Sequence, residues 1–229
     1  WRDRVFFVSD DGFLYCLNVK DGTVAWKFRG GPQDRHVLGN ERLISMWPAR
    51  GAPVVFDDKV YFAAGIFGFM GIFIHALDAE TGKVIWTNSG SGSSYQTHQH
   101  GSPAFAGVSP QGYLAATGEH LLVSGGRSVP AVYERLTGKF LYFHVSSRQF
   151  GKGPGGFGVT ATENLFFNGA CVYGLRDGRG YHRFHEAVHD GQDAYFAHSD
   201  LICSASPRAN ESMGRLGTKT QQFSMQTTL

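Results

Sequence analysis

The chain has 229 residues, with 21 Lys and Arg against 19 Asp and Glu, so its formal charge is only +2. Nucleic-acid-binding proteins usually carry a strong basic excess, and this balance argues against that class. Glycine is abundant at 31 residues and 14% of the residues are aromatic. This composition predicts many short strands joined by tight turns, and it excludes coiled coil, collagen and general disorder.

The first residues enter an apolar strand pattern at once. Trp1 is followed closely by the run Val5–Val8, and neither Met nor a basic and apolar leader comes before it. We therefore expect an internal piece of a longer protein, and the cell compartment has to be inferred in another way.

Four segments share one pattern, in which an apolar residue stands five positions before a glycine and an aromatic residue four after it. These positions are Gly22, Gly82, Gly138 and Gly180, followed by Trp26, Trp86, Tyr142 and Phe184. Alternation before each glycine predicts a strand, and Asp-Gly or Thr-Gly predicts a turn, because glycine accepts positive φ. Each unit is thus a hairpin, and we expect its aromatic ring to dock on the neighbouring unit.

An earlier strand opens each unit, which makes the units larger than hairpins. These opening strands are Val5–Val8, Val60–Ala63, Leu121–Ser124 and Leu165–Asn168. A fifth unit begins at 187–197 and fades after Leu201, Ile202 and Cys203. Units of about four strands at this spacing predict an all-β fold, a β-propeller of four-stranded antiparallel blades with about four to five units. We assign residues 1–208 to this partial propeller and expect 209–229 to be poorly structured or truncated.

One uncharged stretch, from Val60 to Leu77, has a length near that of a membrane span. Gly65, Gly68 and Gly71 interrupt it. Its place in the repeat favours two buried strands joined by an enlarged, apolar, glycine-rich turn, so we expect no transmembrane segment.

The pattern Leu-Asp-Ala-x-Thr-Gly-x-x-x-Trp, present at Leu77–Trp86 and more loosely at Leu17–Trp26, resembles the repeat of the pyrroloquinoline-quinone (PQQ)-like, or quinoprotein-type, β-propellers. The resemblance covers about residues 5 to 208. It implies a ring of eight four-stranded blades, of which this chain is about half, and a location outside the cytoplasm, periplasmic or in the cell envelope. The remainder of the ring is then missing from this chain.

The same resemblance leaves two functions open. Some members are PQQ- and calcium-dependent dehydrogenases, and others are scaffolds without a cofactor, such as the propeller subunit of the bacterial outer-membrane protein assembly machine. Cys16, Cys171 and Cys203 include no adjacent pair of the kind that often packs on PQQ, and we expect buried thiols. No calcium or catalytic position can be matched. We therefore expect a non-catalytic scaffold for a protein or a small polar ligand, without cofactor or metal; the alternative is a piece of an alcohol- or sugar-oxidising dehydrogenase.

Two segments match the sequence motifs of known binding sites but lack the secondary structure that those sites need. His185–His189 reads H-E-x-x-H, which binds zinc on a helix, but it overlaps the fifth strand unit, where residues four apart are roughly 13 Å apart. Gly151–Gly156 reads G-x-G-x-x-G, but a strand follows it instead of the helix that a dinucleotide site needs. We expect a strand in the first case and a linker between blades in the second.

Binding residues are expected in the loops at the strand ends, where a rigid scaffold carries most of its function. Arginine binds carboxylate or phosphate through two parallel hydrogen bonds, and alternating histidines can share a metal or a ligand. The candidates are Arg50, Tyr95, His98, His100 and Arg127.

Overall fold

The computed structural model describes residues 1–39, 41–97, 102–126, 128–144, 155–169, 171–183, 187–189, 194–198, 201–206 and 224–228. These residues form strands and one 3-10 turn, η1 (Gly68–Met70). Within them no helix has the length and apolarity that a membrane crossing requires.

Among the described residues, five sheets are antiparallel meanders in chain order, one of three strands and four of four strands, and two more sheets are two-stranded hairpins. The first blade contains β1 (Arg4–Val8), β2 (Phe13–Asn18) and β3 (Val24–Arg29). The second contains β6 (Val54–Phe56), β7 (Lys59–Ala64), β8 (Phe73–Asp78) and β9 (Val84–Asn88). The third contains β12 (Leu114–Ala116), β13 (His120–Val123), β14 (Ala131–Glu134) and β15 (Phe140–Tyr142). The fourth contains β16 (Val159–Ala161), β17 (Leu165–Asn168), β18 (Cys171–Gly174) and β19 (Gly180–Arg183). The fifth contains β20 (Ala187–His189), β21 (Ala194–His198), β22 (Leu201–Ser206) and β23 (Ser224–Thr228).

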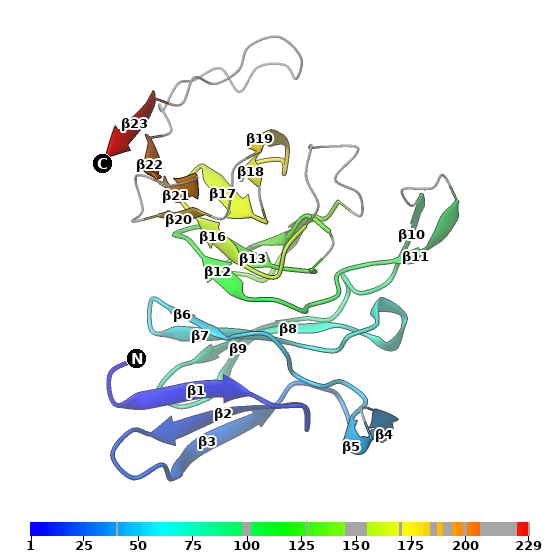
Figure 1. Ribbon diagram of the computed structural model, residues 1–229. Helices are drawn as coiled ribbons and strands as arrows, with labels where there is room; N and C mark the ends of the chain where they lie inside the picture. The colour runs from blue at the N-terminus through cyan, green and yellow to red at the C-terminus, as the bar shows by residue number, and fades with distance from the viewer. Residues whose placement is uncertain are drawn as a thin grey trace.

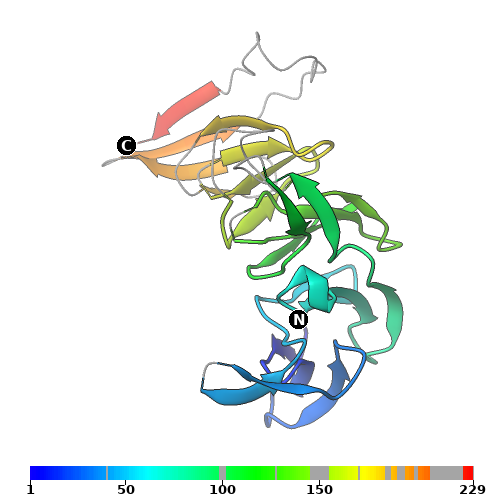
Figure 2. The ribbon, with the colours of Figure 1, turned by 90° about the vertical axis from the view of Figure 1, so that its right-hand side faces the viewer.

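The blades follow one another in chain order, from β1–β3 at the bottom of Figure 1 to β20–β23 at its top, and Figure 2 shows the same succession from the side. The first strands of successive blades, β6, β12, β16 and β20, lie next to each other. The fold is therefore a partial β-propeller, as the sequence predicts. The short inner strands β6, β12 and β16 have only three residues each, and the repeat pattern does not mark them as blade openings.

The predicted docking of aromatic rings on the next blade is present. Gly82, Gly138 and Gly178 all have positive φ in hairpin turns. A Cβ on any of them would lie under 3.0 Å from the ring that the preceding blade presents, which is Trp26, Trp86 and Tyr142 in turn. Glycine is needed here for its conformation and also because a flat ring lies against its Cα.

Two of these rings also donate a hydrogen bond across the junction. The Trp86 indole donates to the carbonyl of Arg135 at 2.9 Å, and the Tyr142 hydroxyl donates to that of Leu175 at 2.6 Å. Within the described ranges the buried indole nitrogen of Trp26 has no such partner. The junctions therefore share a shape but differ in polar contacts.

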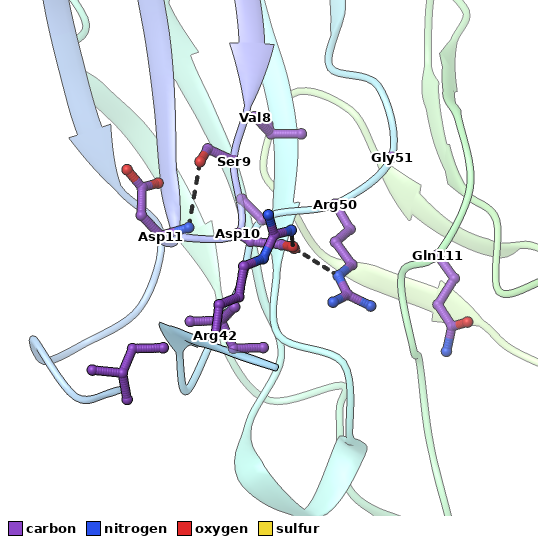
Figure 3. Close-up of a pocket in the computed structure, with 11 residues that line it drawn as sticks. Val8, Ser9, Asp10, Asp11, Arg42, Arg50, Gly51 and Gln111 are labelled. Carbon is purple, nitrogen blue, oxygen red and sulfur yellow. Dashed lines mark hydrogen bonds and ion pairs between the residues drawn. The ribbon is translucent and has the colours of Figure 1, made fainter. Parts of the chain in front are cut away.

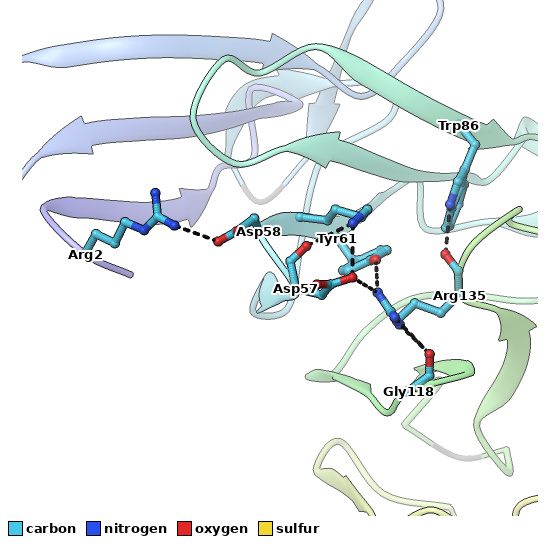
Figure 4. Close-up of polar contacts among 8 residues, drawn as sticks. Arg2, Asp57, Asp58, Tyr61, Trp86, Gly118 and Arg135 are labelled. Carbon is cyan, nitrogen blue, oxygen red and sulfur yellow. Dashed lines mark hydrogen bonds and ion pairs between the residues drawn. The ribbon is translucent and has the colours of Figure 1, made fainter.

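A buried guanidinium strengthens the junction between the second and third blades (Figure 4). The Arg135 side chain is only 6% exposed. It donates to Tyr61 Oη at 3.0 Å and to the carbonyl of Gly118 at 2.8 and 3.0 Å. It also lies 3.6 Å from the Asp57 carboxylate and 4.7 Å from the Phe56 ring centroid. Because the charge is paired and hydrogen-bonded, its burial is tolerated.

In the fourth unit the predicted positions are wrong by two residues. Gly180 is the first residue of β19, and the turn glycine with positive φ is Gly178. In the register of β18 and β19, Val172 faces His182, as Ala76 faces Trp86 in the second blade. His182 therefore occupies the position expected for Phe184, which lies outside the described residues. The two-residue error arises at Leu175. The pattern assigns Leu175 as the apolar residue five positions before the turn glycine, whereas Tyr173 occupies that position in the structure.

The apolar stretch forms β7, η1 and β8, so the prediction of two buried strands around an enlarged turn is confirmed. Cys16 and Cys171 are buried in β2 and β18, as expected. In the C-terminal segment 209–229, residues Ser224–Thr228 form β23, the fourth strand of the last blade. No repeat pattern marks that strand in the sequence.

The two ends of the blades differ. The turn end carries the short hairpin turns, such as 19–23, 79–83 and 135–139. The loop end carries the connections 9–12, 30–53, 65–72 and 89–113, which include two further hairpins. These are β4 (His36–Gly39) with β5 (Arg42–Ser45) and β10 (Ser94–Thr97) with β11 (Pro103–Ala106). Both hairpins project on the same side of the blades in Figure 1.

Candidate functional site

The loop end contains an open pocket of 640 Å³ (Figure 3). Its polar lining includes Asp10 and Asp11 from the turn after β1, Arg42 from β5, Arg50 from the linker to the second blade and Gln111 from the linker to the third. Val8, Leu43, Ile44 and Ala49 supply the apolar part of the lining. The pocket therefore lies where the connections of three blades meet.

The backbone holds the turn that carries Asp10. The amide of Ser45 donates to the Asp10 carbonyl at 2.8 Å, and the amide of Ala49 donates to the Ser9 carbonyl at 3.1 Å. Gly12 has φ +88, and a Cβ there would lie 2.7 Å from Ser45 Oγ. Only glycine allows the turn to approach the 45–49 segment this closely, and this approach positions Asp10 beside the linker that carries Arg50.

The Asp10 carboxylate binds two guanidinium groups, one at each oxygen. Arg50 Nε donates to Oδ1 at 2.9 Å, and Arg42 Nη2 lies 2.6 Å from Oδ2. Burial raises the pKa of Asp10, but the hydrogen bonds from Arg50 and then Arg42 outweigh it, so that the pKa lies below its ordinary value. Asp10 therefore stays ionised at neutral pH and holds both arginines at the pocket.

Asp11 already has local partners and does not compete for the arginines. Its Oδ1 accepts the amide of Phe13 at 3.1 Å, and its Oδ2 accepts the Tyr15 hydroxyl at 2.5 Å. The bond to Asp11 raises the pKa of Tyr15 to about 12. Asp11 therefore stabilises the turn.

The structure places one predicted candidate, Arg50, in the pocket. Tyr95 lies on β10, where its ring meets Phe105 edge-on at 5.3 Å, and it does not line the pocket. His98, His100 and Arg127 lie outside the described residues. Sequence reasoning missed Asp10, Arg42 and Gln111. An acidic Asp-Asp-Gly turn directly after a strand was the available signal for Asp10, whereas nothing in the sequence marks Arg42 or Gln111.

Aromatic side chains are exposed on the loop end. Phe67, which directly precedes η1, stacks on Phe69 within it, and η1 lies against β11 of the second hairpin. Tyr95 and Phe105 are 65% and 68% exposed on that hairpin. Tyr113 and Phe157 are also exposed. Surfaces that expose several large aromatic rings often mark interaction sites.

Comparisons with known proteins identify enzymes and a structural neighbour. No family model matches the chain. The dehydrogenase subunit of an alcohol dehydrogenase (quinone) from Gluconobacter oxydans (strain 621H) is 36% identical over 88 residues, covering 38% of this chain and 11% of that protein. A polyvinylalcohol dehydrogenase from Pseudomonas sp is 25% identical over 212 residues, covering 85% of this chain and 31% of that protein.

In sequence the chain is similar to these dehydrogenases, which agrees with the resemblance of its repeat to the PQQ-like, quinoprotein-type β-propellers. The crystal structure of BamB from Moraxella catarrhalis shares this fold, with a TM-score of 0.50 at 14% identity, and the match covers 99% of this chain and 61% of BamB. The chain thus spans between about a tenth and a third of the two curated relatives and less than two thirds of BamB.

The PQQ-like family includes enzymes that need PQQ and calcium, and the described residues do not fit these groups. Among them no group of three or more His, Cys, Asp or Glu side chains can hold a metal ion. Asp10 and Asp11 are occupied by arginines and by Tyr15. Three tryptophans among the described residues also have structural roles. Trp26 and Trp86 lie in blade junctions, and the Trp47 indole donates a hydrogen bond to the Met70 carbonyl.

The H-E-x-x-H motif is only partly described. Its residues Ala187–His189 form β20, a strand, whereas His185 and Glu186 lie outside the described residues. His189 therefore lies on a strand and not on the helix that a zinc site with this spacing needs.

Proposed function

We infer that the chain is part of an extracytoplasmic, non-catalytic binding propeller, in which the turn end holds the blades together and the loop end binds a protein or a small ligand. The observation that carries this proposal is that the connections of the loop end present exposed aromatic side chains and also form an open pocket. Rigid blades beneath variable loops are a common arrangement for recognition.

Site-specific photo-crosslinking in the full-length parent protein tests the proposal. A benzoylphenylalanine at position 69 replaces Phe69, which is 71% exposed on the loop end. The control replaces Val19, which is 59% exposed at the turn end. A defined partner crosslinked from position 69 and absent from position 19 supports the proposal. Equal labelling at both positions, or none at position 69, contradicts a loop-end binding role for proteins.

The second candidate function is a quinoprotein-type dehydrogenase, to which this chain contributes one part of the ring. It is favoured by the dehydrogenases among the relatives, one of which is similar over 85% of the chain. Because the described residues do not fit PQQ and calcium, the reacting groups then lie outside the described residues, in this chain or in the rest of the parent protein.

A dye-linked oxidation assay decides between the two functions. The full-length parent is incubated with PQQ and Ca²⁺ and supplied with primary alcohols, sugars and polyvinyl alcohol. Turnover that needs both additions overturns the non-catalytic proposal. A folded parent without turnover on all three substrate classes counts against the dehydrogenase.

A further inference from the structure

We propose that the loop-end pocket binds a carboxylate, held by Arg50 with help from Gln111, on a ligand whose remaining body is uncharged. The proposal rests on the inferred binding role of the loop end and names the chemistry of one ligand group there.

The first argument is the unused hydrogen-bonding capacity of Arg50. Its Nε is committed to Asp10, and among the described residues its two terminal nitrogens have no partner. In Figure 3 these nitrogens and the amide of Gln111 point to the same side, away from Asp10. A guanidinium fixed at one edge presents its other nitrogens in the fork that matches a carboxylate.

The second argument is charge. The pocket lining contains two carboxylates, Asp10 and Asp11, and two guanidinium groups, on Arg42 and Arg50, so its formal charges cancel. A dianionic phosphate gains no surplus positive charge there, whereas a monoanionic, planar carboxylate needs only one free guanidinium edge, such as that of Arg50. The apolar lining by Val8, Ile44 and Ala49 suits a neutral, partly apolar ligand body.

The third argument is preorganisation. Asp10 holds Arg50 in place, and the backbone bonds of Ser45 and Ala49 hold the turn that carries Asp10. The backbone amide of Gln111 donates to the Ser124 carbonyl at 3.0 Å, and this hydrogen bond holds the linker that carries Gln111. Little conformational freedom is lost when a ligand binds donors that are already positioned.

The test uses the full chain and three probes: hexanoate, the neutral isostere hexanamide, and inorganic phosphate. Saturation-transfer NMR titrations measure their affinities. We expect saturable binding of hexanoate, with hexanamide and phosphate at least about tenfold weaker, because hexanamide carries no charge and the lining, whose formal charges cancel, offers no surplus positive charge to a dianion. Equal affinity for hexanoate and hexanamide, or no saturable binding of hexanoate, overturns the proposal.

Variants locate the binding. Arg50→Gln is expected to weaken hexanoate by about tenfold or more, and Arg50→Lys by several-fold, because a lysine keeps the charge and loses the fork. The matched control is Arg2→Gln, since Arg2 pairs with Asp58 at the turn end. Unchanged hexanoate affinity in folded Arg50→Gln overturns the proposal. If Arg50→Gln does not fold, unchanged affinity in Arg50→Lys has the same meaning.

Asp10→Asn gives a readout that a structural role alone does not move. It leaves both arginines charged and removes one negative charge, so the preference for hexanoate over phosphate should fall by several-fold. An unchanged preference contradicts the assigned role of Asp10.

Competition experiments distinguish two sources of the carboxylate. A tetrapeptide with a free C-terminus that displaces hexanoate, while its amidated form does not, points to a polypeptide end. Binding of hexanoate without such competition points to a small acid. A loop end that crosslinks a partner from position 69 and does not bind hexanoate overturns the carboxylate site alone and leaves the proposed function standing.

Discussion

The turn end and the loop end of the blades use similar side chains for different roles. At the turn end, an aromatic ring of one blade lies on a glycine of the next, and Trp86 and Tyr142 add hydrogen bonds to backbone carbonyls. At the loop end, aromatic rings face solvent, and the guanidinium of Arg50 keeps two nitrogens without a partner among the described residues. The turn end therefore holds the sheets together, and the loop end keeps polar groups and aromatic rings available for binding. Changes at the first should therefore affect stability, and changes at the second should affect recognition.

The largest expected effect comes from removing a junction ring. Trp86→Ala should lower the free energy of unfolding by about 3–5 kcal/mol, measured in urea, because a large half-buried ring and its bond to the Arg135 carbonyl are lost. Trp86→Phe keeps most of the packing and should cost about 1 kcal/mol. Trp26→Phe is the matched control with almost no cost, since the Trp26 indole donates no bond within the described residues. A loss below about 1 kcal/mol for Trp86→Ala would falsify the docking role.

The next effect depends on pH and concerns the contact between the first two blades. His75 Nε2 lies 2.8 Å from the Gly30 carbonyl, which can only accept, so this nitrogen carries the proton, and Nδ1 accepts the Thr87 hydroxyl at 2.9 Å. Burial lowers the pKa of His75 from 6.5 to about 4, against the opposing effect of the bond to Gly30. The imidazole is therefore neutral in the folded protein.

The sign follows from which state binds the proton. Between pH 6.5 and pH 4, His75 binds a proton in the unfolded chain but not in the folded chain. The free energy of unfolding therefore keeps its full contribution from His75 above about pH 6.5 and decreases as the pH drops. The loss from this residue approaches roughly 3 kcal/mol near pH 4. His75→Gln should flatten the dependence of urea midpoints on pH. Parallel slopes in the two proteins would show that His75 is not the group responsible.

A pair of glycines separates the cost of conformation from the cost of packing. Gly22 and Gly138 occupy the same turn position with φ +71 and +73, but only a Cβ on Gly138 meets a tryptophan ring; a Cβ on Gly22 meets nothing within 4 Å. Gly22→Ala should cost about 1 kcal/mol for the left-handed backbone, and Gly138→Ala about 2–3 kcal/mol. Equal costs in thermal or urea unfolding would mean that Trp86 moves away without penalty.

The repeat could be predicted from the sequence because glycine and aromatic residues recur at a spacing that strands and turns demand. Gly22, Gly82 and Gly138 lie where that pattern predicts them. The prediction for the fourth unit was wrong because Leu175 and Gly180 have the same spacing as the true pair, Tyr173 and Gly178, but lie two residues later in the chain. The inner strands of three residues are too short to show alternation.

The pocket could be predicted only in part. Arg50 was found because it precedes a Gly-Ala-Pro linker at a strand end. Asp10, Arg42 and Gln111 come from three segments that meet only after folding, so no sequence spacing connects them. Their roles depend on which nitrogen pairs with which oxygen, which is a tertiary property.

The division between the two ends is tested most directly by measuring stability and binding on one pair of variants, Arg50→Gln and Gly138→Ala. Arg50→Gln should change the free energy of unfolding by less than about 1 kcal/mol, since its ion pair is partly exposed, and should weaken hexanoate by about tenfold or more. Gly138→Ala should lose stability and, at urea-free conditions where it is folded, bind hexanoate like the unmodified chain. Loss of hexanoate binding in folded Gly138→Ala, or full binding in Arg50→Gln, would contradict the division.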